Sequence, residues 1–231
     1  METLDAVKRE GKDRLCPSLT NPNWLILRWR REIFKAWLAA IPGTNLRVLD
    51  IGGRIQPYRP LLESRIARYI AIDVRRSPLV DVVALAERIP LSDAEFDLVI
   101  CTQVLEYIQD PAELIGEVHR VLKPGGSLLL SAPAVFPRDS DEDLWRFSPA
   151  SLRLLLRGFS YVAIAPEGSS LTGFVRTASV CLVRFAKPAF LGKVFRFTLV
   201  PAMNVVMRAL ELILATENDQ FTANFSAIAT K

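Results

Sequence analysis

Val48-Leu49-Asp50-Ile51-Gly52-Gly53 reads as an apolar strand that runs straight into two glycines. A second apolar run, residues 69–72, follows and ends in the carboxylate of Asp73. Glycines let a backbone approach a ligand closely, and an acid after the second strand can receive ribose hydroxyls. The pair therefore predicts a doubly wound α/β fold that holds a nucleoside-containing cofactor.

Composition limits the classes of protein to consider. The chain has 231 residues and half of them are hydrophobic, which is enough for one large domain with a substantial core. Three widely spaced cysteines without a C-x-x-C pair, and a single histidine, argue against a disulfide framework, a metal site or a histidine-based triad. We expect no metal and a reducing, cytoplasmic location.

No membrane-spanning segment is expected. The first twenty residues carry charges throughout, unlike a secretory leader. The longest apolar run, residues 194–215, is interrupted by charged residues and a proline. We therefore expect a soluble or peripheral protein.

Apolar strands alternate with amphipathic helices along most of the chain. Asn23 is a predicted helix N-cap, Asp110-Pro111 opens another helix, and Pro124-Gly125-Gly126 ends it. Residues 1–20 are polar and are expected to be irregular. Helices are expected over 24–41, 60–67, 110–122 and 148–157, and strands over 46–51, 69–73, 80–83, 96–101, 127–131, 159–165 and 226–230.

This alternation predicts a Rossmann-like three-layer α/β/α sandwich with a seven-stranded, mostly parallel sheet and a helical insertion before the last strand. We expect a single domain, 1–231. It divides into an N-terminal helical extension (1–42), a cofactor-binding core (43–167), a helical insertion or cap (168–221) and the last strand (222–231).

The residues after each predicted strand should meet at one edge of the sheet. In open parallel sheets the ligand lies outside the carboxyl ends of the strands, at the switch point beside the first strand. The segments 50–53, 73–74, 84–87 and 102–103 would therefore form one crevice.

Four segments carry a family resemblance. They are VLDIGGR (48–54), YIAID (69–73), AERIPLSDAEFDLVICTQVLEYIQDP (86–111) and EVHRVLKPGGSLLLSAP (117–133). In this order and spacing the chain resembles class I S-adenosylmethionine-dependent methyltransferases of the ubiquinone/menaquinone-methyltransferase-like group, over about residues 46–165.

The resemblance implies S-adenosylmethionine as the cofactor. Asp50, Gly52 and Gly53 would line its methionine portion, and Asp73 would bind the ribose hydroxyls.

Three further positions belong to the implied cofactor site. Ala86 and Glu87 would lie near the adenine, and Gln103 would close the site after the fourth strand.

The stretch PRDSDEDLWRFSP, residues 137–149, holds the candidates for catalysis. It resembles a D-x-W-R-F-(T/S)-P motif of methyltransferases linked to glycan and cell-envelope chemistry. Transfer to oxygen usually needs a base. The possible bases are Asp139, Asp141, Glu142 and Asp143. Arg146 could orient the substrate, Tyr107 is a further candidate outside the stretch, and we select none of them as the catalytic residue. The alternative interpretation is an acidic surface loop before a helix cap.

Residues 171–215 combine apolar and basic side chains with one acid, Glu211. A helical cap on the sheet is one interpretation. A second is a peripheral membrane surface that admits a lipid-linked acceptor, and a third is a homodimer interface. No nucleic-acid recognition motif occurs, so we expect no nucleic-acid partner.

The predicted function is methyl transfer from S-adenosylmethionine to a small-molecule, glycan or lipid-linked acceptor, at oxygen. One alternative is a catalytically inactive methyltransferase-like binding protein. The second is an NAD(P)-dependent oxidoreductase, but its G-x-G-x-x-G pattern is absent, because Gly52-Gly53 is followed by Arg54-Ile55-Gln56-Pro57.

Overall fold

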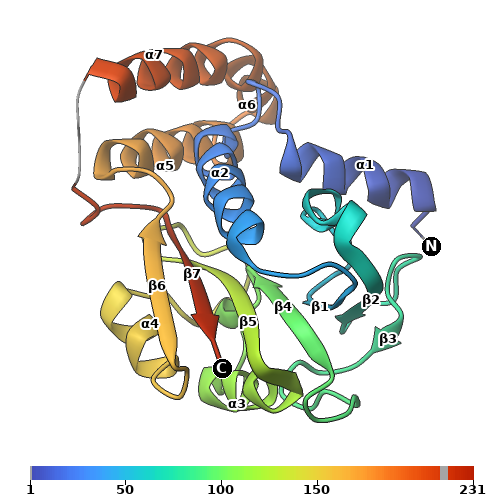
Figure 1. The fold of residues 1–231 in the computed structure, drawn as a ribbon. Coiled ribbons are helices and arrows are strands. Elements are labelled where there is room, and N and C mark those ends of the chain that lie inside the picture. Colours follow the sequence, from blue (N-terminus) through green and yellow to red (C-terminus); the bar gives the residue numbers. More distant parts are fainter. Residues whose placement is uncertain (1, 214–217) are drawn as a thin grey trace.

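One sheet organises the described residues, which in this computed structural model are 2–213 and 218–231. Its order is β3-β2-β1-β4-β5-β7-β6 (Figure 1). The expected insertion (168–221) and basic segment (171–215) both extend into residues 214–217, which lie outside the described residues. The strands are β1 (Leu46–Ile51), β2 (Ile66–Asp73), β3 (Val82–Val83), β4 (Phe96–Thr102), β5 (Leu122–Pro133), β6 (Tyr161–Pro166) and β7 (Asn224–Thr230).

Strand direction follows the sequence prediction. β1 pairs in parallel with both β2 and β4, and β4 pairs in parallel with β5. β7 is the exception, because it lies antiparallel between β5 and β6. The chain order reverses between β1 and β4, so the switch point lies where the glycine turn leaves β1.

Helices cover both faces of this sheet and give the three expected layers. α3 and α4 pack against one face through Leu114, Val118 and Leu152. α2 packs against the other through Phe34 and Leu38. The helices are α1 (Leu4–Leu15), α2 (Trp24–Ala40), α3 (Pro111–Val121), α4 (Pro149–Leu155), α5 (Ser170–Arg184), α6 (Ala189–Phe197) and α7 (Leu199–Ile213).

α5, α6 and α7 follow β6 and precede β7 in the chain, and they form a separate helical layer. Figure 1 shows them beyond the end of the sheet toward which β6 points. They pack on one another and on α2. Glu211 of α7 fastens this layer to α2, because it pairs with Arg28 and accepts a hydrogen bond from Trp29 Nε1 at 2.8 Å.

The prediction of an irregular N-terminus is wrong, because residues 4–15 form α1. The Thr3 side chain caps its first turn by accepting from the Ala6 amide. α1 buries only Val7 and Gly11, so its apolar pattern is too sparse to be recognised. A Cβ on Gly11 would lie 2.3 Å from the Ile55 carbonyl oxygen, so only glycine permits this approach.

The helix expected over 60–67 is also wrong. Two 3-10 helices, Arg59–Leu61 and Glu63–Arg65, occupy this stretch, and β2 begins directly at Ile66. The Arg65 side chain donates to carbonyls at the end of α2, including Leu38 O at 2.7 Å. That tertiary role, and the early start of β2, leave no room for a full α-helix.

Asn23 stands before α2 as expected but does not cap it. Its side-chain oxygen accepts from Arg176 Nε of α5 at 2.8 Å, so it links two helices instead.

A buried ion pair joins α2 to the end of β6. Arg30 is 2% exposed and Glu167 is fully buried, and Arg30 Nε donates to Glu167 Oε1 at 2.9 Å. Ser131 of β5 and Ser226 of β7 donate to the same oxygen, at 2.6 and 2.7 Å. One carboxylate therefore holds a helix and two neighbouring strands together.

Glu167→Ala should lower the free energy of unfolding by about 3–5 kcal/mol, because it leaves a buried guanidinium without its partner. Glu32→Ala, which breaks the exposed Arg31–Glu32 pair on the same helix, should cost less than about 1 kcal/mol. Urea denaturation measures both, and equal losses would contradict the special role of Glu167.

Candidate active site

A cavity of about 630 Å³ opens at the carboxyl edge of the sheet. Its walls come from the ends of β1, β2 and β4, from the segment after β3 and from the loop after β5. Ligand cavities are typically about 300–1,000 Å³, so the size suits a nucleoside-containing cofactor. The position is the one predicted for a ligand at the switch point.

Five of the seven residues predicted to bind cofactor line this cavity: Gly52, Asp73, Ala86, Glu87 and Gln103. The other two, Asp50 and Gly53, are not among the lining residues. The structure thus brings most of the predicted set together at one place, while their binding roles stay predictions.

The two glycines meet different constraints. Gly52 has φ +73°, and a Cβ there would lie 2.5 Å from Val104 Cγ2. A Cβ on Gly53 would lie 2.7 Å from the Asp50 carbonyl oxygen and 2.9 Å from Ala71 Cβ. Gly52 therefore keeps the cavity wall thin, and Gly53 lets the turn pack against β1 and β2.

Asp50 lies just behind the cavity wall, on β1. Its side chain accepts a hydrogen bond from the Tyr69 hydroxyl of β2 at 2.6 Å. Burial raises the pKa of Asp50 to about 7, against the opposing effect of the Tyr69 bond, and the charge of Asp73 raises it further. A cationic group bound nearby would favour the ionised carboxylate.

Asp73 ends β2 at the cavity. One of its carboxylate oxygens accepts from the Arg75 amide at 2.8 Å, which fixes the turn after the strand. Its position at the strand end is where ribose hydroxyls bind in such folds.

Gln103 follows β4 in a left-handed conformation, with φ +56°. Its amide donates to the Ser131 carbonyl at 2.9 Å, and its side chain hydrogen-bonds with the side-chain amide of Asn224 on β7. Strained backbone held by its neighbours is typical of functional sites.

Glu87 places a carboxylate at the cavity. Its Oε2 is buried without a hydrogen-bond partner among the described residues. A buried acceptor left unsatisfied is costly. This oxygen is therefore free to receive a donor from a ligand.

Four of the catalytic candidates form two pairs; of the other two, Glu142 lines the cavity and Asp141 does not. Asp139 and Tyr107 line the cavity, with the Tyr107 hydroxyl 3.5 Å from Asp139 Oδ2. Burial, with nearby carboxylates, raises the pKa of Tyr107 to about 12, so it is a poor base near neutrality.

Asp143 and Arg146 pair with each other and do not line this cavity. Arg146 bonds lower the pKa of Asp143, although burial opposes this. Arg146 also donates to Phe136 O at 3.1 Å. The pair holds the loop after β5 in place.

Val74 and Leu85 also line the cavity, within the segments 73–74 and 84–87 that the sequence predicts to meet there. Arg75 lines it as well and was not predicted, although its position two residues after Asp73 was an available signal. Glu106 lies next to Tyr107, is 4% exposed, and has one carboxylate oxygen without a partner among the described residues. Burial raises the pKa of Glu106 to about 7, and no sequence pattern indicates this.

Comparisons with known proteins identify the class of this domain. Residues 49–130 match the family described as "Methyltransferase domain". The ubiquinone biosynthesis O-methyltransferase of Pseudomonas aeruginosa is 34% identical over 92 residues, 38% of this chain and 35% of that protein. The demethylmenaquinone methyltransferase of Renibacterium salmoninarum is 32% identical over 114 residues, 45% of this chain and 47% of that protein. The chain thus spans less than half the length of these curated relatives.

A solved structure extends the similarity to the whole fold. The Burkholderia thailandensis 1,6-didemethyltoxoflavin-N1-methyltransferase, with S-adenosylhomocysteine bound, superposes with a TM-score of 0.55 at 15% identity. The match covers 98% of this chain and 84% of that one. At this identity the likeness shows the fold.

The switch-point cavity and the sheet order define a Rossmann-like domain of the class that binds nucleoside cofactors. The matched segment places it further: residues 49–130 carry the features of a class I S-adenosylmethionine-dependent methyltransferase domain. S-adenosylmethionine is the cofactor of that class, and the family and fold predicted from the sequence are confirmed.

Asp50→Asn should change how stability depends on pH. Because the folded-state pKa is raised, protonated Asp50 stabilises the fold at low pH, and this contribution is lost as pH rises from about 4 to about 7. The unfolding free energy of the wild type relative to Asp50→Asn should therefore fall over that window, on the order of a few kcal/mol, and then level off.

Urea titrations from pH 4 to 8 test this. Asp97→Asn is the control of opposite sign: the pKa of Asp97 is lowered despite burial, through bonds from Lys123 and the Arg47 amide, so its contribution disappears as pH falls. If the unfolding free energy of the wild type relative to Asp50→Asn rises with pH, the raised pKa of Asp50 is contradicted.

Proposed function

We propose that this protein is an enzyme that transfers a methyl group from S-adenosylmethionine to a small-molecule, glycan or lipid-linked acceptor, at oxygen. The observation that carries the proposal is the cavity itself. Five residues chosen from motif positions in the sequence converge on it from four segments of the sheet edge.

The residues present fit the cofactor. Asp73 would hold the ribose hydroxyls, and the unsatisfied Glu87 oxygen, beside Ala86, would receive a donor at the adenine end. Gly52, which has no side chain to fill the cavity, would leave room for the methionine portion, and Gly53 would support the turn. Asp50 would supply negative charge behind this turn. The bound cofactor supplies a methyl group activated on a sulfonium.

The acceptor side lies at the loop after β5. Asp139 lines the cavity, and its position is held by Arg184 of α5, with Arg184 Nη2 donating to the Asp139 carbonyl at 2.7 Å. An oxygen nucleophile needs a group to take its proton. Asp139 is the candidate carboxylate that both faces the cavity and is fixed there. The ubiquinone biosynthesis O-methyltransferase among the relatives supports oxygen as the acceptor atom.

A nicotinamide cofactor is disfavoured by the backbone after β1. Dinucleotide sites place a helix N-terminus against the pyrophosphate. In residues 52–65, all of which are described, only two three-residue 3-10 helices occur. A cofactor without phosphates therefore suits this turn better.

A cytoplasmic location is part of the proposal. Cys16, Cys101 and Cys181 are all free. Thiols persist in reducing compartments, which supports this location.

Asp73→Ala should weaken the binding of S-adenosylhomocysteine by about 1–3 kcal/mol through lost hydrogen bonds to the ribose. Isothermal calorimetry measures the affinity, and Glu113→Ala on α3, outside the cavity, should leave it unchanged. The cofactor assignment would be overturned if the wild type does not bind S-adenosylhomocysteine at millimolar concentration. Binding of NADH in a fluorescence titration would overturn it as well.

Turnover separates an enzyme from an inactive binding protein. Incubation with methyl-labelled S-adenosylmethionine and a cell extract should label a product. Asp139→Asn should cut that labelling by about a hundredfold or more. Asp141→Asn, which changes an exposed residue of the same loop outside the cavity, should not.

The phase that carries the label identifies the acceptor class. Partition into organic solvent indicates a lipid-linked acceptor, and retention in water a soluble one. Cofactor binding without any labelled product would support the inactive alternative.

A further inference from the structure

The exposed residues of α7 are all apolar, and Arg208, which is partly exposed at the edge of this face, pairs with Glu211. The exposed apolar side chains recur at intervals of three and four residues, so they form one stripe along the helix. Val206 is 58% exposed and Leu212 is 71% exposed. The stripe consists of Ala202, Val205, Val206, Ala209, Leu212 and Ile213.

α6 continues this apolar surface with aromatic residues. Its inward face is set by Gly192, where a Cβ would lie 2.4 Å from the Val183 carbonyl oxygen of α5. Phe190, Val194 and Phe197 are exposed, Phe197 by 66%. We call the exposed side chains of α6 and α7 the α6–α7 surface.

The charges beside this surface are all positive. Lys187, Lys193 and Arg196 are exposed and make no ion pair within the described part of the chain. The one acid in residues 171–213, Glu211, is withdrawn from the surface by Arg28 and by Thr172 Oγ1, which donates to it at 2.9 Å. The α6–α7 surface therefore carries exposed cations and no exposed carboxylate.

We propose that the α6–α7 surface docks on a bilayer that contains anionic lipid. Aromatic and aliphatic side chains with interspersed cations suit the headgroup layer of such a membrane. A second copy of the chain is the poorer occupant, because a two-fold contact would bring the same unpaired cations face to face.

The helices lie on the membrane and do not cross it. The stretch Ala189–Ile213 is long and apolar enough for a span, with a mean hydropathy of 1.3. Thr198 divides it into two helices, however, and α7 buries Val200, Asn204 and Met207 against the protein. Asn204 Nδ2 donates to Leu19 O at 2.8 Å, so α7 is fastened to the N-terminal segment.

Docking would place the cavity rim close to the bilayer. α5 connects the surface to the loop after β5, because Arg184 holds Asp139 and Arg176 stacks over Phe136 at 3.4 Å. The inference concerns binding to lipid and stands independently of the methyl-transfer reaction.

Sedimentation with lipid vesicles tests the proposal on the full chain. The protein should bind vesicles of phosphatidylglycerol and phosphatidylcholine at low salt, and bind pure phosphatidylcholine far less. Lys193→Glu with Arg196→Glu should weaken binding by on the order of tenfold or more. Val206→Asp with Leu212→Asp should weaken it similarly, because the apolar stripe no longer enters the interface.

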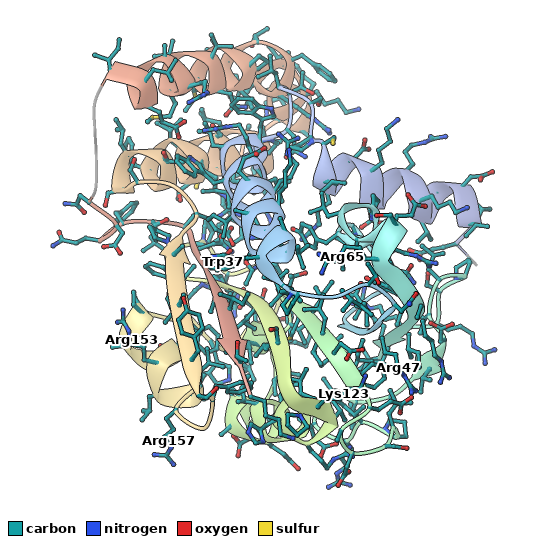
Figure 2. The ribbon with its side chains drawn as sticks, in the orientation of Figure 1. Trp37, Arg47, Arg65, Lys123, Arg153 and Arg157 are labelled. Atoms are coloured by element: carbon teal, nitrogen blue, oxygen red, sulfur yellow. The ribbon has the colours of Figure 1, made fainter. Side chains whose placement is uncertain are left out.

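Matched controls come from α4 and the turn that follows it. Arg153 and Arg157 lie at the end of the molecule opposite α7 (Figure 2), so Arg153→Glu with Arg157→Glu should leave binding unchanged. Leu154→Asp, which changes a leucine that is 64% exposed there, should also leave binding unchanged. Unchanged thermal unfolding and cofactor affinity would show that each variant is folded.

Three results would overturn the proposal. The first is no binding to anionic vesicles at low salt. The second is an equal loss of lipid binding in the Arg153/Arg157 and Leu154 control variants. The third is a dimer, detected by light scattering, that the Val206 and Leu212 changes dissociate without affecting lipid binding.

Discussion

A single buried carboxylate connects the layers of this domain. Glu167 is the residue after β6, and its carboxylate accepts hydrogen bonds from Arg30 of α2, Ser131 of β5 and Ser226 of β7. Without that cluster, two adjacent strands and the covering helix would each bury polar groups that lack partners. The arrangement of the helical layer over the carboxyl edge of the sheet follows from it, since α5 begins three residues after Glu167.

The same cluster reaches the cavity. Ser131 accepts from the backbone of Gln103 and lies beside its side chain, and Asn224 pairs with that side chain from β7. Gln103 is thereby held in a left-handed conformation that an isolated residue disfavours. The cavity wall is thus built from the packing of the core, and not from the glycine turn alone.

Local sequence predicts the elements whose patterns are local. The strand at 46–51 matches β1 in both bounds, and Asp110 and Ser148 cap α3 and α4 as their positions indicate. The alternation of strands and helices also predicts the fold and the edge where the cavity lies. These features depend on neighbours within a few residues.

What escaped prediction depends on contacts between distant segments. α1 is stabilised by ion pairs from Arg54 to Glu2 and Glu10, and by the close approach at Gly11. Asp50 was expected in the cavity but lies behind its wall, because its side chain accepts a hydrogen bond from Tyr69 on the adjacent strand. The pairing of Arg30 with Glu167 joins positions 137 residues apart, and no motif marks it.

The place of β7 in the sheet has a consequence for synthesis of the protein. This last strand lies between β5 and β6, and its Asn224 orients a residue of the cavity. β7 leaves the ribosome after every other strand of the sheet, so the sheet has a gap between β5 and β6 until β7 has been synthesised. The cofactor-binding wall is therefore finished only after β7 has been synthesised, and a nascent chain that still lacks β7 would expose two unpaired strand edges in the middle of its core.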